Sequence, residues 1–139
     1  EPNRWLRKPL KGSSGFGIAF APVGEVSDRG RGLYWQVFVE GRPMSALFDA
    51  RGSDVRFLDT TAQLIGVDWL HAPPFRYSGN VGPVDMGGCY SDEILFAARH
   101  LVADLGVRGP FGIDFVNDGD CAWFIEVNPR YTASVEVHE

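Results

Sequence analysis

The sequence Gly112-Ile113-Asp114-Phe115-Val116, followed by Phe124-Ile125-Glu126-Val127-Asn128-Pro129-Arg130, decides the fold of this 139-residue chain. Both stretches are rich in strand-forming residues, and the Asp-Gly-Asp sequence at 118–120 is typical of a turn between strands. We therefore predict a hairpin of two antiparallel strands, Gly109 to Asn117 and Cys121 to Val127. Polar residues inside such runs need an explanation, because interior carboxylates are unfavourable unless they are paired or bound to a metal.

The side of the hairpin that each polar residue occupies depends on the turn. Glu126 and Asn128 are two residues apart, so they share a face of their strand. A two-residue loop would place Glu126 opposite Phe111, with Asp114 on the other face. A three-residue loop would place Glu126 opposite Gly112, with Asp114 on the same face. Odd loops with a left-handed glycine are common in hairpins, so both alternatives stay open.

Three oxygen donors on one face would form a metal site. Asp114, Glu126 and Asn128 offer carboxylate and amide oxygens, which suit Mg²⁺, with Mn²⁺ as an alternative ion. Arg130, just beyond the second strand, could hold a phosphate. The competing interpretation is an ordinary exposed hairpin with alternating polar positions.

The patterns in the rest of the chain predict further strands, a helix between Ser91 and Leu105, and the start of another helix after Pro129. Apolar residues recur at helical spacing between Ser91 and Leu105, with Ser91 as the N-terminal cap and Gly106 as the stop. Arg42-Pro43 is expected to turn the chain between two strands. The other predicted strands are Leu33 to Glu40, Met44 to Ala50, Val55 to Ile65 and an extended segment from Arg76 to Val84. This pattern indicates an α+β fold.

Charge and cysteine content exclude several classes of function. The formal net charge is -5 and the pI about 5.1, so neither nucleic acid nor an acidic membrane surface is expected as a partner. No apolar run is long enough to span a bilayer. Cys89 and Cys121 are far apart and form no CxxC motif, which favours a reducing cytoplasm.

The second strand carries a family resemblance. Glu126-Val127-Asn128-Pro129-Arg130 resembles the metal-binding signature of ATP-grasp enzymes. In that family an acidic residue on the preceding strand, then Glu and Asn, hold two Mg²⁺ ions, and the following Arg contacts phosphate or an acyl-phosphate. The resemblance assigns the metal roles to Asp114, Glu126 and Asn128 and a catalytic role to Arg130.

The start of the chain resembles the same family. Lys8-Pro9, followed by a glycine-rich loop, is similar to the family's phosphate-binding lysine and its closing loop, and glycines let backbone N–H groups approach phosphate. The loop residues implied in ATP binding are Gly12, Ser13, Ser14, Gly15 and Gly17. The adenine hinge maps to Gln36, Val37, Phe38 and Val39. Many members place a ribose-binding Glu just beyond the hinge, whereas this chain has Arg42 and Pro43 there.

The resemblance implies an ATP-grasp fold, an antiparallel sheet with few helices, with residues 1–139 as the C-terminal part of the domain. It implies a ligase that uses ATP and Mg²⁺ to activate a small-molecule carboxylate as an acyl-phosphate, which an amine or thiol then attacks. Lys8 and Arg130 would be catalytic. One rival is a catalytically silent ATP-binding or regulatory module, and a second is an interaction protein without a ligand. We expect the chain to be a piece of a longer polypeptide and leave open a homo-oligomer.

Overall fold

The chain forms two compact units. The computed structural model describes residues 4–22, 32–85 and 88–133. The N-terminal unit comprises Glu1–Val39 and Ile65–Ser78, and the C-terminal unit comprises Glu40–Leu64 and Gly79–Glu139. The main chain therefore passes between the units at Val39, at the end of the segment predicted to bind adenine.

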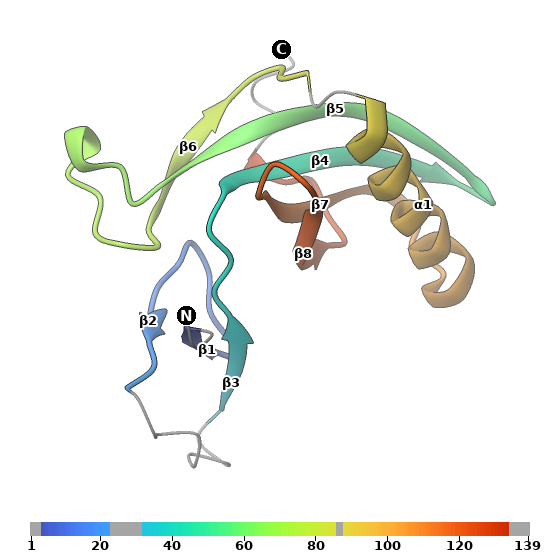
Figure 1. Ribbon diagram of the computed structural model, residues 1–139. Helices are drawn as coiled ribbons and strands as arrows, with labels where there is room; N and C mark the ends of the chain where they lie inside the picture. Colours follow the sequence, from blue (N-terminus) through green and yellow to red (C-terminus); the bar gives the residue numbers. More distant parts are fainter. Residues whose placement is uncertain (1–3, 23–31, 86–87, 134–139) are drawn as a thin grey trace. The chain divides into compact units, whose positions relative to one another are not determined.

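The N-terminal unit contains a three-stranded antiparallel sheet with the order β2-β1-β3 (Figure 1). Its strands are β1 (Trp5–Pro9), β2 (Ala19–Phe20) and β3 (Leu33–Val37). Leu6 and Lys8 alternate onto one face of β1, and both are buried. The predicted strand from Leu33 to Glu40 thus ends three residues early, and residues 38–40 run on without strand pairing.

Aromatic side chains pack together in the N-terminal unit. The ring of Phe20 meets the rings of Phe38 and Phe75 edge-on, at centroid distances of 5.1 and 5.2 Å. The Arg4 guanidinium lies 4.5 Å from the centroid of the Phe38 ring, a favourable cation–π distance. These contacts join the segment after β3 to residue 75, which follows the short 3-10 helix η1 (Asp68–Leu70).

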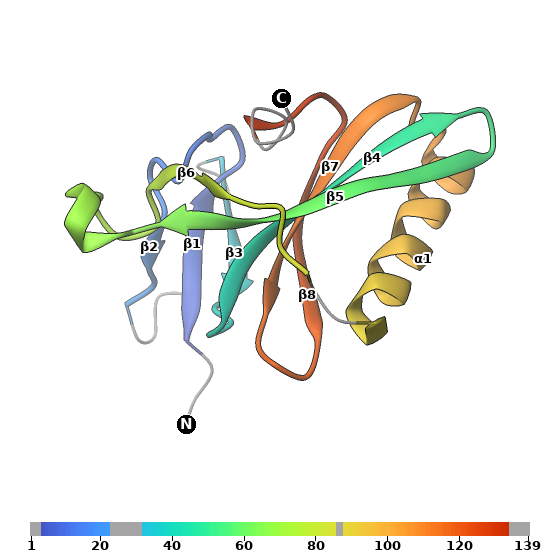
Figure 2. The ribbon, with the colours of Figure 1, turned by 90° about the horizontal axis from the view of Figure 1, so that it is seen from above.

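The C-terminal unit is built on a five-stranded antiparallel sheet with the order β6-β5-β4-β7-β8. Figure 1 shows helix α1 against one face of the long, curved strands β4 and β5, and Figure 2 shows β7 and β8 continuing the sheet beyond β4. The elements are β4 (Arg42–Arg51), β5 (Asp54–Ile65), β6 (Tyr77–Val81), α1 (Gly88–Leu105), β7 (Gly109–Asn117) and β8 (Ala122–Asn128).

The core of this unit lies between the sheet and α1. Even-numbered residues of β4 and odd-numbered residues of β7 point to the helix, because side chains alternate along a strand. On α1 the facing residues are Ile94, Ala98 and Val102, which follow helical spacing. The rings of Phe48 and Phe111 stack at 5.2 Å within this layer. The opposite face of the sheet is left for the odd-numbered residues of β4 and the even-numbered residues of β7.

Two local predictions need correction. Helix α1 begins at Gly88, so Ser91 lies inside the helix and does not cap it; the apolar spacing that identified the helix does not fix its first turn. Arg42 and Pro43 belong to β4, where Pro43 pairs with Val116, and no turn forms there. Gly106 does end the helix, with a φ of 67° and its amide bonded to the Val102 carbonyl at 3.1 Å.

Antiparallel sheets with one α-helix among the described residues confirm the predicted α+β class. In the same part of the chain, no helix combines the length and apolar character that crossing a membrane requires.

Candidate functional site

The β7–β8 hairpin brings Asp114 directly opposite Glu126. The turn has neither of the two lengths considered above, because Asn117 pairs with Ala122 and four residues lie between them. A four-residue turn alone would send the two carboxylates to opposite faces. The pairing shifts by one residue beside Asp114, and the resulting β-bulge leaves Ile125 without a partner. The bulge restores the parity, so both carboxylates share a face.

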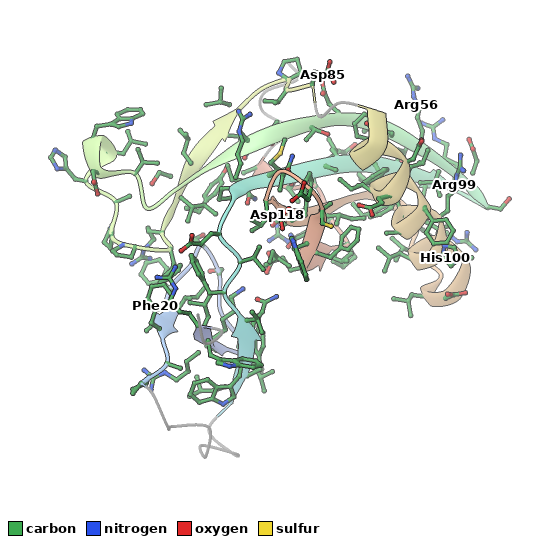
Figure 3. All side chains as sticks on the ribbon, viewed as in Figure 1. Phe20, Arg56, Asp85, Arg99, His100 and Asp118 are labelled. Atoms are coloured by element: carbon green, nitrogen blue, oxygen red, sulfur yellow. The ribbon has the colours of Figure 1, made fainter. Side chains whose placement is uncertain are left out.

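The side chain of Asp118 holds the turn together. Its Oδ1 accepts hydrogen bonds from the amides of Asp120 at 2.9 Å and Cys121 at 2.8 Å, and its Oδ2 accepts one from Trp123 Nε1 at 2.6 Å. Figure 3 shows Asp118 at this end of the hairpin. These bonds stabilise the ionised form, and the Cys121 amide contributes most to lowering the pKa of Asp118.

Asn128 joins the two carboxylates. Its Nδ2 donates to Asp114 Oδ2 at 3.2 Å and to Glu126 Oε1 at 3.1 Å. Asp114 is half-buried and Glu126 is exposed, so the group opens to solvent on the Glu126 side. The sheet face that these three side chains share is the one opposite α1, since Ile113 and Phe115 on either side of Asp114 belong to the helix-facing core.

The surroundings of Asp114 disfavour its negative charge. Burial is the main cause, and together with the nearby Glu126 carboxylate it raises the pKa of Asp114 to about 6, although the side chains of Ser45 and Gln63 lower it in part. Asp114 Oδ1 is buried and has no hydrogen-bond partner among the described residues. A cation at this position would relieve both the desolvation and the repulsion.

A row of polar side chains continues from Asp114 across the sheet. Asp114 pairs with Ser45 on β4, which pairs with Thr61 on β5. Thr61 Oγ1 donates to Asn80 Oδ1 on β6 at 3.3 Å. Ser45 and Thr61 were not identified from the sequence. Ser45 interrupts the apolar middle of β4, which was the one signal available, whereas Thr61 follows two other polar residues of β5. Only the pairing of β5, β4 and β7 aligns both residues with Asp114.

The donor set fits a hard divalent cation. Two carboxylates and an amide present oxygen atoms, which Mg²⁺ and Mn²⁺ prefer. A side-chain rotation of Asn128 exchanges its donating nitrogen for its accepting oxygen. Among the described residues, no three His, Cys, Asp or Glu side chains lie close enough together to bind a metal ion. The candidate site here has two carboxylates, with the amide of Asn128 as the third ligand.

Arg130 lies in the segment that follows β8, in the same unit as the carboxylates. Its amide donates to the Asn128 carbonyl at 2.8 Å, and its guanidinium donates to the Tyr131 carbonyl at 3.2 Å. The side chain is exposed. The bond to the Asn128 carbonyl ties the backbone of Arg130 to one of the three metal candidates, and the guanidinium is exposed to solvent.

Lys8 and Gln36, both predicted to bind ATP, are in contact within the N-terminal unit. Lys8 Nζ donates to Gln36 Oε1 at 2.6 Å. The two residues lie diagonally on one face of the β1–β3 pair, because Leu6 is the residue directly opposite Gln36. Lys8 is only 7% exposed, and the Gln36 amide orients its ammonium group. Of the remaining hinge residues, Val37 ends β3, while Phe38 and Val39 follow it.

The glycine-rich loop contacts the start of β6 and the residues just before it. The Ser14 carbonyl accepts from the Tyr77 amide at 3.3 Å, and the Phe16 ring lies under the Arg76 guanidinium at 3.0 Å.

The backbone conformation of the loop requires glycine at position 15. Gly15 has a φ of 77°, and a Cβ there would collide with the Phe75 carbonyl. Ser14, Gly15 and Gly17 all adopt left-handed backbone, while Gly12 packs against the ring of Pro9 and the Ser13 carbonyl accepts from the Phe16 amide at 3.0 Å.

The structure thus assembles the candidate residues into two groups. The metal candidates and Arg130 belong to the C-terminal unit, and Lys8, the glycine-rich loop and the hinge belong to the N-terminal unit. This is an α+β protein with a carboxylate–amide cluster on an antiparallel sheet and a lysine beside a glycine-rich loop.

Comparison with known proteins identifies the family. A family model described as an ATP-grasp domain matches residues 1–134, and the chain therefore belongs to the ATP-grasp family. No curated protein matches its sequence.

Solved structures share the fold. An ATP-grasp superfamily protein from Archaeoglobus fulgidus is 28% identical, with a TM-score of 0.70 over 97% of this chain and 39% of its own. L-amino acid ligase from Bacillus licheniformis is 18% identical, with a TM-score of 0.73 over 99% of this chain and 34% of its own. N5-carboxyaminoimidazole ribonucleotide synthetase from Thermus thermophilus is 20% identical, with a TM-score of 0.65 over 95% and 36%. The chain spans well under half the length of each.

Proposed function

We propose that this chain is the nucleotide- and metal-binding part of an ATP-dependent ligase that activates a small-molecule carboxylate. The observation that carries the proposal is the group formed by Asp114, Glu126 and Asn128, in which one amide nitrogen bonds both carboxylates. Membership of the ATP-grasp family supports it, as does the fold shared with two solved proteins named as a ligase and a synthetase.

The C-terminal unit would hold the divalent cation. Asp114, Glu126 and Asn128 would be its ligands, and Mg²⁺ bound there would neutralise charge on the phosphates of ATP. The buried, unpartnered Oδ1 of Asp114 fits this role, since a bound cation would satisfy it. Arg130 would contact the transferred phosphoryl group or the acyl-phosphate, because an exposed guanidinium can donate two parallel hydrogen bonds to phosphate oxygens.

The N-terminal unit would hold the nucleotide. Lys8, oriented by Gln36, supplies a positive charge for the phosphates, and the glycines of the loop expose backbone N–H groups to them. Residues 36–39 would read adenine through their backbone at the point where β3 ends, although the Phe38 amide already donates to the Arg4 carbonyl at 2.8 Å. Arg42 and Pro43 stand where many members have a ribose-binding Glu, so ribose recognition must use another residue.

The chemistry would be phosphoryl transfer from ATP to the substrate carboxylate, followed by attack of an amine or thiol and release of phosphate. The side chains named above do not form covalent bonds in this scheme. They position the reactants and stabilise developing charge, which are the main contributions a protein makes to phosphoryl transfer. We place this reaction in the cytoplasm.

Binding measurements on the chain test the metal and nucleotide roles. Mn²⁺ binding, followed by the electron paramagnetic resonance signal of free Mn²⁺, should weaken at least tenfold in Glu126→Gln. The matched control is Asp104→Asn, an exposed carboxylate on α1, which should bind Mn²⁺ like the parent chain. Equal Mn²⁺ affinity in the parent chain and Glu126→Gln would reject the proposed metal site.

The alternative is a catalytically silent ATP-binding or regulatory module. The presence of Arg42 and Pro43 in place of the expected ribose-binding Glu is the observation that favours it. Phosphate release separates the two functions when it is measured on the protein encoded by the complete gene with a panel of carboxylic acids and amines. Release that depends on acid and amine and is lost in Glu126→Gln supports the ligase. ATP binding without such release supports the silent module.

A further inference from the structure

Ser45 is a buried hydroxyl on the sheet face that carries the carboxylates. It lies in the middle of β4 and is only 2% exposed, between Met44 and Ala46, which point to the opposite, helix-facing core. Its Oγ has no hydrogen-bond partner among the described residues. Burying a hydroxyl without a partner is unfavourable, so a serine here needs an explanation other than packing.

The register places Ser45 directly opposite Asp114 on the neighbouring strand. Directly paired residues of antiparallel strands project to the same face with their Cβ atoms close together. The hydroxyl is near enough to lower the pKa of the Asp114 carboxyl, yet Ser45 Oγ and Asp114 Oδ1 are both buried without a hydrogen bond. Two unpartnered buried oxygens, one of which carries a rotatable proton, therefore lie on directly paired residues of the same sheet face.

The other oxygen of Asp114 has a different partner. Oδ2 accepts from Asn128 Nδ2 at 3.2 Å, so Asn128 acts on one side of the carboxylate and Ser45 lies on the β4 side. A hydroxyl donor is neutral, so it can orient the carboxylate without competing with a cation for its charge. Lysine or arginine at this position would compete.

We propose that Ser45 is a positioning residue that donates its hydroxyl proton to Asp114 and fixes this carboxylate for a divalent cation. The inference rests on the proposed metal role of Asp114, Glu126 and Asn128. Partners of this kind, one step removed from the metal, typically change metal affinity by about 10- to 100-fold when removed.

Thr60 provides an internal control. Its Oγ1 is also buried and unpartnered, and its side chain is 1% exposed. Thr60 pairs with Ala46, however, so it belongs to the helix-facing side of the same sheet and not to the carboxylate side. If Mn²⁺ affinity fell only because a buried hydroxyl was lost, removing the hydroxyl of Thr60 should lower it as much as removing that of Ser45. If Ser45 acts on the metal ligands, only its removal should lower Mn²⁺ affinity.

The test is Mn²⁺ affinity in the absence of nucleotide, measured for Ser45→Ala, Ser45→Cys, Ser45→Thr, Thr60→Val and Glu126→Gln. We expect Ser45→Ala to raise the Mn²⁺ dissociation constant about tenfold or more. The nearly isosteric Ser45→Cys, whose thiol is only a weak donor, should weaken binding as well, and it keeps the test available if the alanine variant does not fold. Ser45→Thr retains the hydroxyl and should restore binding, while Thr60→Val should leave it unchanged.

The outcomes distinguish failure of the Ser45 role from failure of the metal site itself. If the parent chain binds Mn²⁺ through Glu126 but neither Ser45→Ala nor Ser45→Cys binds more weakly, the role of Ser45 is refuted and the metal site stands. If Thr60→Val weakens binding as much as Ser45→Ala, the effect is structural and the role of Ser45 is again refuted. If Glu126→Gln binds Mn²⁺ as tightly as the parent chain, the metal site and the inference that rests on it both fail.

Discussion

Replacing Asp114 by asparagine should stabilise the metal-free protein at neutral pH and destroy its metal site. The change removes a charge that burial and the neighbouring Glu126 disfavour, and it keeps an oxygen that can still accept from Asn128. Stability and metal binding should therefore change in opposite directions, which is expected where a fold retains an unfavourable charge for its function.

The size and sign of the effect follow from the pKa of Asp114. That pKa is raised from 3.8 to about 6 in the folded protein. Above pH 6 both the folded and the unfolded chain carry the charge, and ionisation costs the folded state about 3 kcal/mol. Between pH 6 and pH 3.8, the folded protein has bound a proton at Asp114 that the unfolded chain has not yet taken up. The contribution of Asp114 to the free energy of unfolding therefore rises on acidification and is complete below pH 3.8.

Urea denaturation of the metal-free chain between about pH 4 and pH 7 measures this contribution. Asp114→Asn should be more stable than the parent chain by up to about 3 kcal/mol at pH 7, and this difference should disappear towards pH 4. The control Asp104→Asn, on the exposed side of α1, should follow the pH profile of the parent chain. A difference between Asp114→Asn and the parent chain that is independent of pH would refute the reasoning.

The same samples with metal should show the reverse order. A cation at about one hundred times its dissociation constant adds about 2.7 kcal/mol to the stability of the protein that binds it. Added Mg²⁺ should therefore raise the urea midpoint of the parent chain at pH 7 and leave that of Asp114→Asn unchanged. Equal shifts in both proteins would mean that Mg²⁺ binds elsewhere.

Three further substitutions test the remaining parts of the site. Lys8→Met keeps the buried stem but removes the charge, and it should weaken ATP binding in calorimetry by about 1.5–3 kcal/mol; an unchanged dissociation constant would contradict the assignment. Gly15→Ala should lower the melting temperature more than Gly32→Ala does, because both glycines have positive φ but only Gly15 faces a backbone carbonyl; equal effects would leave backbone strain as the only cause. Asp118→Ala should speed hydrogen exchange of the Cys121 amide by removing its acceptor, and unchanged exchange would show that the turn holds without this side chain.

Local sequence patterns predicted most of the secondary structure, because each pattern depends on a few neighbouring residues. The predicted strand from Gly109 to Asn117 matches β7, and the second strand of the hairpin is displaced by one residue to Ala122–Asn128. Helix α1 was found from its apolar spacing, and its true start at Gly88 lies three residues earlier than predicted. The first helical turn is defined by backbone geometry, which apolar spacing does not report.

The side on which Asp114 lies could not be settled from the hairpin sequence. Two features that act together decide it, a turn with an even number of residues and a bulge at Ile125. The four-residue turn without the bulge would place Asp114 on the opposite face, and so would the bulge with a three-residue turn. The turn is visible in the sequence as Asp118 and the residues that it caps. The bulge is not, because Ile125 is an ordinary strand-forming residue in a run of others. The sequence therefore indicated that the two carboxylates could form a site. The register of β7 against β8 places them on the same face.

Ser45 shows the same limit at longer range. In the sequence it is a lone serine in a strand that was predicted for other reasons, and 69 positions separate it from Asp114. Its significance depends on β4 lying between β5 and β7, an order that requires chain connections no local pattern encodes. The even-numbered residues of β4 are apolar where they meet α1, so Ser45, with odd parity, must serve the other face of the sheet. On that face the pairing with β7 places a buried acceptor directly opposite its hydroxyl, the carboxylate of Asp114.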